Sequence, residues 1–135
     1  MSEILPKFER GYTAAMAAGR YHDAFLSQLG GCTHKHVSGF PLPGLMLQYE
    51  SLLRKMDLYS VYSLHGASME TLDLLRVLTG KKEIDFEQLH ASLLAPYKSS
   101  ELNQHLLKHL TGLQLGVFFG NLQFGGKMIL SLIHI

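Results

Sequence analysis

The stretch LMLQYESLLRKM, residues 45–56, decides the fold class of this chain. Its apolar side chains recur every three or four positions, and polar or charged side chains fill most of the positions between them. The recurring apolar residues are Leu45, Tyr49, Leu52, Leu53 and Met56. This spacing places them along one face of a helix, where they can pack against other helices. The stretch therefore predicts an amphipathic helix that belongs to a helical bundle.

Five further helices are predicted on either side of this one. Four of them cover residues 6–18, 21–29, 69–79 and 86–95. The last helix begins after Ser99 or Ser100. Its apolar stripe consists of Leu102, Leu106, Leu110, Leu113 and Val117. Leucine is far more frequent in the chain than valine and isoleucine together, and side chains without a branch at Cβ lose little rotamer freedom in a helix. We therefore predict an all-α fold, a single-domain bundle of about six helices without strands.

Several of the predicted helix ends carry residues that stabilise such ends. Pro6 lies in a first turn, where its missing N–H does no harm, and Gly19 follows a last turn, where a positive φ angle is common. Ser68 is expected to cap the helix that follows it. Asp85 and Gln88 form a variant of the capping box, which predicts that a helix begins at this aspartate.

The turn between the first two predicted helices reads AGRYHDA, residues 18–24. It resembles the inter-helix turn of a tetratricopeptide repeat, where Gly, Tyr and Ala occupy these relative positions. One repeat length further on, the corresponding residues are Leu53, Lys55 and Leu58, so no second copy follows. We take this short resemblance to predict a tight helical hairpin.

Residues 30–44, GGCTHKHVSGFPLPG, contain four glycines and two prolines and show no helical period. This composition predicts one long ordered loop. Within it Cys32, His34 and His36 alternate, and alternating side chains of an extended backbone leave it on the same side.

A thiolate and imidazoles are ligands that zinc and copper accept, so Cys32, His34 and His36 form a candidate metal site. His105 and His109 lie four positions apart on the last predicted helix and would add two ligands from one face. A lysine stands between the candidate ligands in each segment, however, and would oppose a cation. The alternative is that all these histidines are solvated, in the loop and on the surface of the helix.

Gly112, Gly116 and Gly120 form a candidate interface. Glycines four positions apart share one helix face, which another backbone can approach closely. Three interpretations stay open: close packing within a soluble bundle, contact with a protein partner or a second copy, and a membrane segment. The surrounding uncharged stretch, residues 110–126, is shorter than the ~20 apolar residues that a membrane helix needs, so the membrane interpretation is not favoured.

Charge and cysteine content exclude some classes of protein. The net charge of the 135 residues is +1 and no basic block is present, which argues against a nucleic-acid partner. The single cysteine excludes an internal disulfide and favours the cytoplasm or another reducing compartment. No nucleotide-binding or hydrolase motif occurs, so nothing in the sequence indicates an enzyme.

The last six residues, LSLIHI, resemble the translation of a transposase adapter used in DNA sequencing libraries. This resemblance implies that residues 128–135 are a tail of non-native sequence and that the natural chain departs from this one after about residue 128. We therefore expect the helical domain to cover residues 1–127.

These features together predict a helical protein–protein interaction module, an adaptor or a small subunit of a larger assembly. It would bind a protein partner or a second copy of itself through helix faces and residues 30–44, without a cofactor. One alternative is a zinc- or copper-binding protein or enzyme built on the cysteine and histidines. The other is the soluble head of a truncated membrane protein.

Overall fold

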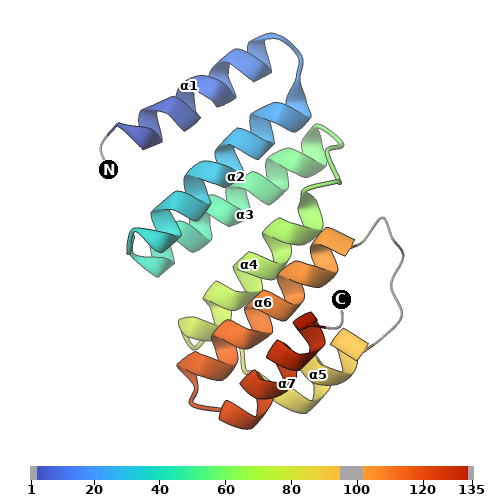
Figure 1. Cartoon of the computed structure of the whole chain (residues 1–135). Helices are drawn as coiled ribbons and strands as arrows, with labels where there is room; N and C mark the ends of the chain where they lie inside the picture. Colours follow the sequence, from blue (N-terminus) through green and yellow to red (C-terminus); the bar gives the residue numbers. More distant parts are fainter. Residues whose placement is uncertain (1–2, 95–101, 134–135) are drawn as a thin grey trace. The chain divides into compact units, whose positions relative to one another are not determined.

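A computed structural model describes residues 3–94 and 102–133, and within these ranges every regular element is a helix (Figure 1). The helices are α1 (Ile4–Ala17), α2 (Tyr21–Val37), α3 (Leu42–Leu58), α4 (His65–Leu78), α5 (Phe86–Leu94), α6 (Leu102–Phe118) and α7 (Leu122–Ile133). The prediction of an all-α fold is confirmed. The described residues hold seven helices where about six were predicted, and the addition is α7, for which the sequence suggested no helix.

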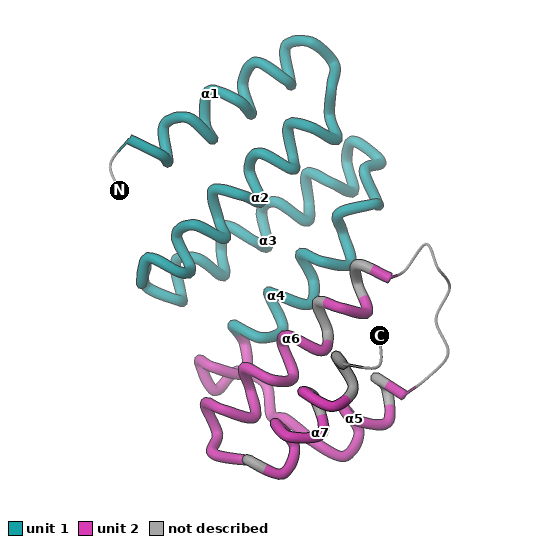
Figure 2. The backbone as a smooth tube through the Cα atoms, viewed as in Figure 1, with its two compact units in different colours: residues 1–75 teal, residues 76–135 magenta. Residues whose placement is uncertain are grey.

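The chain divides into two compact units, residues 1–75 and residues 76–135 (Figure 2). The first contains α1, α2, α3 and most of α4. The second contains the end of α4 with α5, α6 and α7. The single domain expected over residues 1–127 stays a prediction.

The core of the first unit forms around α3, as the spacing of its apolar residues predicts. All five residues of the predicted stripe are buried, and Leu45, Tyr49, Leu52 and Met56 are at most 1% exposed. They pack against side chains of α2 and α4, among them Phe25, Leu72 and Leu75. Burial of one such leucine or methionine contributes about 1.5 to 3 kcal/mol, so this cluster accounts for much of the stability of the unit.

Residues 30–44 do not form the long loop that the sequence predicts. α2 continues to Val37, and α3 already begins at Leu42, so the connection is confined to residues 38–41. The prediction was wrong because it treated the glycine pair in this segment as the end of a helix.

Gly30 and Gly31 lie inside α2, where the ring of Phe8 on α1 packs directly on them. A Cβ atom at Gly30 would lie 2.7 Å from Phe8 Cε1, and one at Gly31 would lie 3.4 Å from Phe8 Cβ. The missing side chains therefore admit the neighbouring helix. This packing offsets the low helix propensity of glycine, which costs roughly 1 kcal/mol per residue.

Ser68 is not the helix cap that was expected. α4 begins earlier, at His65, so that Ser68 lies within the helix and is fully buried. Its hydroxyl donates to the carbonyl oxygen of Leu64, four residues before it, at 3.0 Å. A serine that bonds back in this way is satisfied inside a helix and marks no helix start.

Five helices, α1 to α4 and α6, end in the same local structure, the Schellman motif. After α1, for example, the N–H of Arg20 donates to the carbonyl oxygen of Ala15 at 2.9 Å. The residues with positive φ at these ends are Gly19, Gly39, Ser60, Gly80 and Gly120, at intervals of 20, 21, 20 and 40 positions. The helical hairpin predicted around Gly19 is thus confirmed, and similar turns recur along the chain.

We expect the substitution Ser60→Gly to raise the free energy of unfolding by about 0.5 to 1 kcal/mol. Ser60 has a φ angle of 56°, and such a left-handed conformation costs an L residue about 1 to 2 kcal/mol. Glycine avoids this cost, but it also gives the unfolded chain more conformational freedom, which reduces the gain in stability. Urea unfolding measures the change. The matched control is Gly39→Ala, which should lower stability because the φ angle of Gly39 is 78°, a conformation that strains alanine. Nothing lies within 4 Å of the added Cβ, so backbone strain alone causes the expected loss. Unchanged stability in both variants would contradict this account of the helix ends.

In the second unit, α6 and α7 form a hairpin with a very close backbone contact. A Cβ atom at Gly116 would lie 3.1 Å from the Cα and the N of Gly125 and 3.3 Å from the ring of Phe124. α7 begins after Asn121, whose side-chain oxygen accepts the N–H of Phe124 at 3.0 Å. The ring of Phe124 packs against that of Phe86 on α5, with centroids 4.7 Å apart.

The cap predicted at Asp85 is confirmed. Its carboxylate oxygen Oδ1 accepts the backbone N–H groups of Glu87 and Gln88, both at 3.0 Å. These two groups have no partner within the helix, because they belong to its first turn. α5 accordingly begins at Phe86.

Candidate functional site

The cysteine and histidines of α2 do not share a side. In a helix, residues two positions apart point about 200° from each other, so Cys32 and His34 diverge, and so do His34 and His36. Cys32 is buried, and the Nε2 atom of His34 is buried without a hydrogen-bond partner among the described residues. The extended geometry on which the metal site was predicted is therefore wrong.

His105 and His109 do lie on one face of α6, but both are buried. They are 9% and 2% exposed, their ring centroids are 4.5 Å apart, and Nδ1 of His109 lies 2.9 Å from the carbonyl oxygen of His105. The alternative that placed these histidines on the helix surface is thus also wrong. Within residues 3–94 and 102–133, no three His, Cys, Asp or Glu side chains gather as a set of metal ligands.

The three glycines of the candidate interface have different surroundings. Gly112 and Gly116 are buried in α6, and Gly116 faces Gly125 of the same chain. Gly120 lies beyond the end of the helix, with a φ angle of 67° and nothing within 4 Å of an added Cβ. The face that Gly116 offers is thus in contact with α7. None of the helices in the described ranges has the length and apolarity that crossing a membrane requires.

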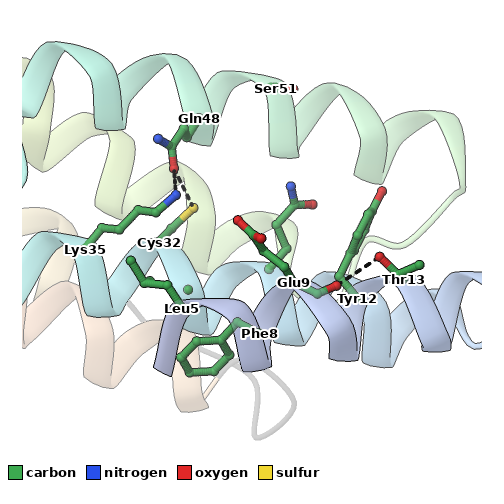
Figure 3. A pocket seen from close by; sticks show the side chains of 11 residues that line it. Leu5, Phe8, Glu9, Tyr12, Thr13, Cys32, Lys35, Gln48 and Ser51 are labelled. Atoms are coloured by element: carbon green, nitrogen blue, oxygen red, sulfur yellow. Dashed lines mark hydrogen bonds between the residues drawn. The ribbon is translucent and has the colours of Figure 1, made fainter. Parts of the chain in front are cut away.

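A cavity in the first unit brings together apolar, polar and charged side chains. Its volume is about 470 Å³, and Figure 3 shows α1 and α3 on either side of it with side chains of α2 between them. The lining residues are Leu5, Phe8, Glu9, Tyr12 and Thr13 of α1, Gln28, Gly31, Cys32 and Lys35 of α2, and Gln48 and Ser51 of α3.

Lys35 and Gln48 close one end of the cavity. The ammonium group of Lys35 donates to Oε1 of Gln48 at 2.9 Å, and the Cys32 thiol lies 4.0 Å from the same oxygen (Figure 3). Burial raises the pKa of Cys32 above its usual value, and the charge of Lys35 lowers it in part. The thiol therefore stays protonated and weakly nucleophilic at neutral pH.

Acceptors and an aromatic ring line the rest of the cavity. The carboxylate of Glu9 is on the α1 side, and Oε1 of Gln28 is a buried acceptor with no hydrogen-bond partner in the described structure. The ammonium group of Lys55 lies over the ring of Tyr12, 5.4 Å from the ring centroid. The cavity therefore offers both hydrogen-bonding groups and apolar surface to a bound molecule.

The sequence contains one signal for this cavity that our predictions missed. Leu5, Phe8, Glu9, Tyr12 and Thr13 stand at i, i+3, i+4, i+7 and i+8, the spacing of one helix face. Two of these five residues are polar, although a face that packs fully into a core is apolar. In agreement with this mixed face, no residue of α1 is fully buried.

Comparison of the chain with protein-family models, with curated proteins and with solved structures found no match.

Proposed function

We propose that this protein is a helical protein–protein interaction module, an adaptor or small subunit, that binds an extended segment of a partner protein in the cavity between α1, α2 and α3. The cavity of about 470 Å³ carries this proposal: its volume is in the range of roughly 300 to 1,000 Å³ that pockets for small molecules occupy, so it can take up a part of a peptide of similar size. We call it the α1–α3 groove.

The side chains of the α1–α3 groove match the chemistry of a peptide. Leu5, Phe8 and Tyr12 offer apolar surface to the partner's side chains. Gln28 and Gln48 carry amide groups, which can both donate and accept hydrogen bonds and so match the N–H and C=O groups of a peptide backbone. The neutral thiol of Cys32 gives the groove no activated nucleophile of its own, which favours binding over catalysis.

Selection from a phage-displayed library of random linear peptides tests the proposal. The wild-type protein should enrich peptides that share a sequence pattern. Thr13→Trp and Ser51→Trp, which place an indole ring in the groove from opposite sides, should each weaken the binding of a selected peptide by about tenfold or more, a loss of about 1.4 kcal/mol.

The matched control is Ala14→Trp, because Ala14 is exposed on α1, adjoins Thr13 and does not line the groove. It should bind the selected peptide as the wild type does. Circular dichroism verifies that all three variants fold. If no peptide is enriched, or if the selected peptides bind the two groove variants as tightly as the control, the α1–α3 groove is not a peptide site.

A further inference from the structure

Lys35 is a half-buried cation in the wall of the α1–α3 groove, and its protein partners are uncharged. Its ammonium group donates to the Gln48 amide at 2.9 Å and lies 5.8 Å from the centroid of the Phe40 ring. No carboxylate in residues 3–94 or 102–133 lies within 4.0 Å of it. An ammonium group has three N–H donors, and an unpaired charge that is partly removed from water is costly. Lys35 therefore offers a positive charge in the wall of the groove that no described carboxylate neutralises.

The groove also has a second cation nearby and two acceptor groups in its lining. Lys55 lies against Tyr12, which lines the groove, and forms no ion pair within the described residues. Oε1 of Gln28 is a buried acceptor without a hydrogen-bond partner in the described residues, and the exposed carboxylate of Glu9 is a second acceptor in the lining. A molecule that presents an anionic group to Lys35 and hydrogen-bond donors to Gln28 and Glu9 would therefore complement the groove.

We propose that the α1–α3 groove selects peptides with an aspartate or glutamate at one position, whose carboxylate pairs with the ammonium group of Lys35 beside Gln48. This inference rests on the proposed function and specifies which peptides the groove takes. The backbone N–H groups of the same peptide can donate to Oε1 of Gln28 and to the carboxylate of Glu9. A carboxylate bonded to an ammonium group forms one of the stronger hydrogen bonds in proteins, so the acidic residue dominates the choice of partner.

The experiment compares one selected peptide that contains the acidic residue with its amide counterpart, in which Asp is replaced by Asn or Glu by Gln. The wild-type protein should bind the acidic peptide about tenfold or more tightly than the amide peptide. In Lys35→Met, which keeps most of the side-chain length, this preference should disappear. In Lys35→Arg, which keeps the charge, it should largely remain. The wild-type preference should also decrease as salt is added.

The matched control for the loss of charge is Lys7→Met, since Lys7 is exposed on α1 and does not line the groove. It should keep the full preference for the acidic peptide. Peptides that bind in the groove without an acidic residue, or a preference that survives in Lys35→Met, would overturn the assignment of Lys35 and leave the proposed function intact. If no peptide depends on the groove in the selection with Thr13→Trp and Ser51→Trp, both proposals fail.

Discussion

The substitution Gly116→Leu is expected to lower the free energy of unfolding by about 1 to 3 kcal/mol, the usual cost of adding side-chain volume to a filled contact. The backbone of Gly125 lies 3.1 Å from the position of an added Cβ at Gly116. A leucine there forces α6 and α7 apart, because backbone atoms cannot turn away as the end of a flexible side chain can. Urea unfolding of the full chain gives the free energy, and amide hydrogen exchange in α6 and α7 locates the loss.

The control for this prediction is Gly126→Ala in α7. Gly126 is exposed, and nothing lies within 4 Å of a Cβ added to it. It should therefore gain roughly 0.5 to 1 kcal/mol from the better helix propensity of alanine. If Gly116→Leu were neutral or stabilising, the backbones of α6 and α7 would not be in contact at this position. Gly116 would then be free to contact a partner, as one interpretation of the sequence proposes.

The second large effect is a loss of stability in alkali that arises from Tyr49. This side chain is 1% exposed. Its pKa is raised from 10.0 to about 12, mainly because burial disfavours the charged form. This value already includes the hydrogen bonds with the side chains of Thr33 and Thr71, which lower the pKa, and the nearby Cys32, which raises it. Above pH 10 the unfolded chain gives up this proton, whereas the folded chain keeps it up to pH 12. The stabilisation is thus complete below pH 10, and about 2 to 3 kcal/mol of it is lost as the pH rises to 12.

Unfolding in urea at a series of pH values between 9 and 12.5 measures this loss, and Tyr49→Phe isolates it. Phenylalanine keeps the ring in the core but has no proton to lose. Between pH 10 and 12 the free energy of unfolding of the variant should therefore fall less than that of the wild type, and the difference is the contribution of Tyr49. Cys32 is present in both proteins, so the difference between them reports the proton of Tyr49 together with its interaction with Cys32. Equal slopes in the two proteins would mean that Tyr49 titrates as it does in the unfolded chain.

The parts of the fold that follow from local sequence could be predicted. The apolar spacing of residues 45–56 identifies α3, Gly19 marks the end of α1, and Asp85 marks the start of α5. Each of these signals acts through the backbone of its own helix, so it is readable without knowledge of the rest of the molecule.

The continuation of α2 through Gly30 and Gly31 could not be predicted in this way. Glycine ends a helix in one setting and admits a neighbouring helix in another, and the side chain that decides, Phe8, lies more than twenty positions earlier. The wrong loop led in turn to the wrong geometry for the metal site on Cys32. The same difficulty affects Gly116, whose partner Gly125 belongs to the helix that the sequence did not indicate.

The α1–α3 groove depends on the distance between helices that are not neighbours along the chain. Lys35 and Gln48 carry no motif, and each is an ordinary residue of its own helix. Their bond follows from the packing of α2 on α3. The polar residues within one face of α1 could have drawn attention to that face, but not to what lies opposite.

The contacts between successive helices also affect how the chain reaches its folded state. The closely packed pairs, α1 with α2, α2 with α3 and α6 with α7, are neighbours along the chain. The loops that must close are therefore short, and the entropy lost in closing them is small. Helical proteins with such local contacts fold within microseconds to milliseconds. In these three pairs the later helix can therefore dock on the one synthesised just before it, so that this part of folding can keep pace with the ribosome.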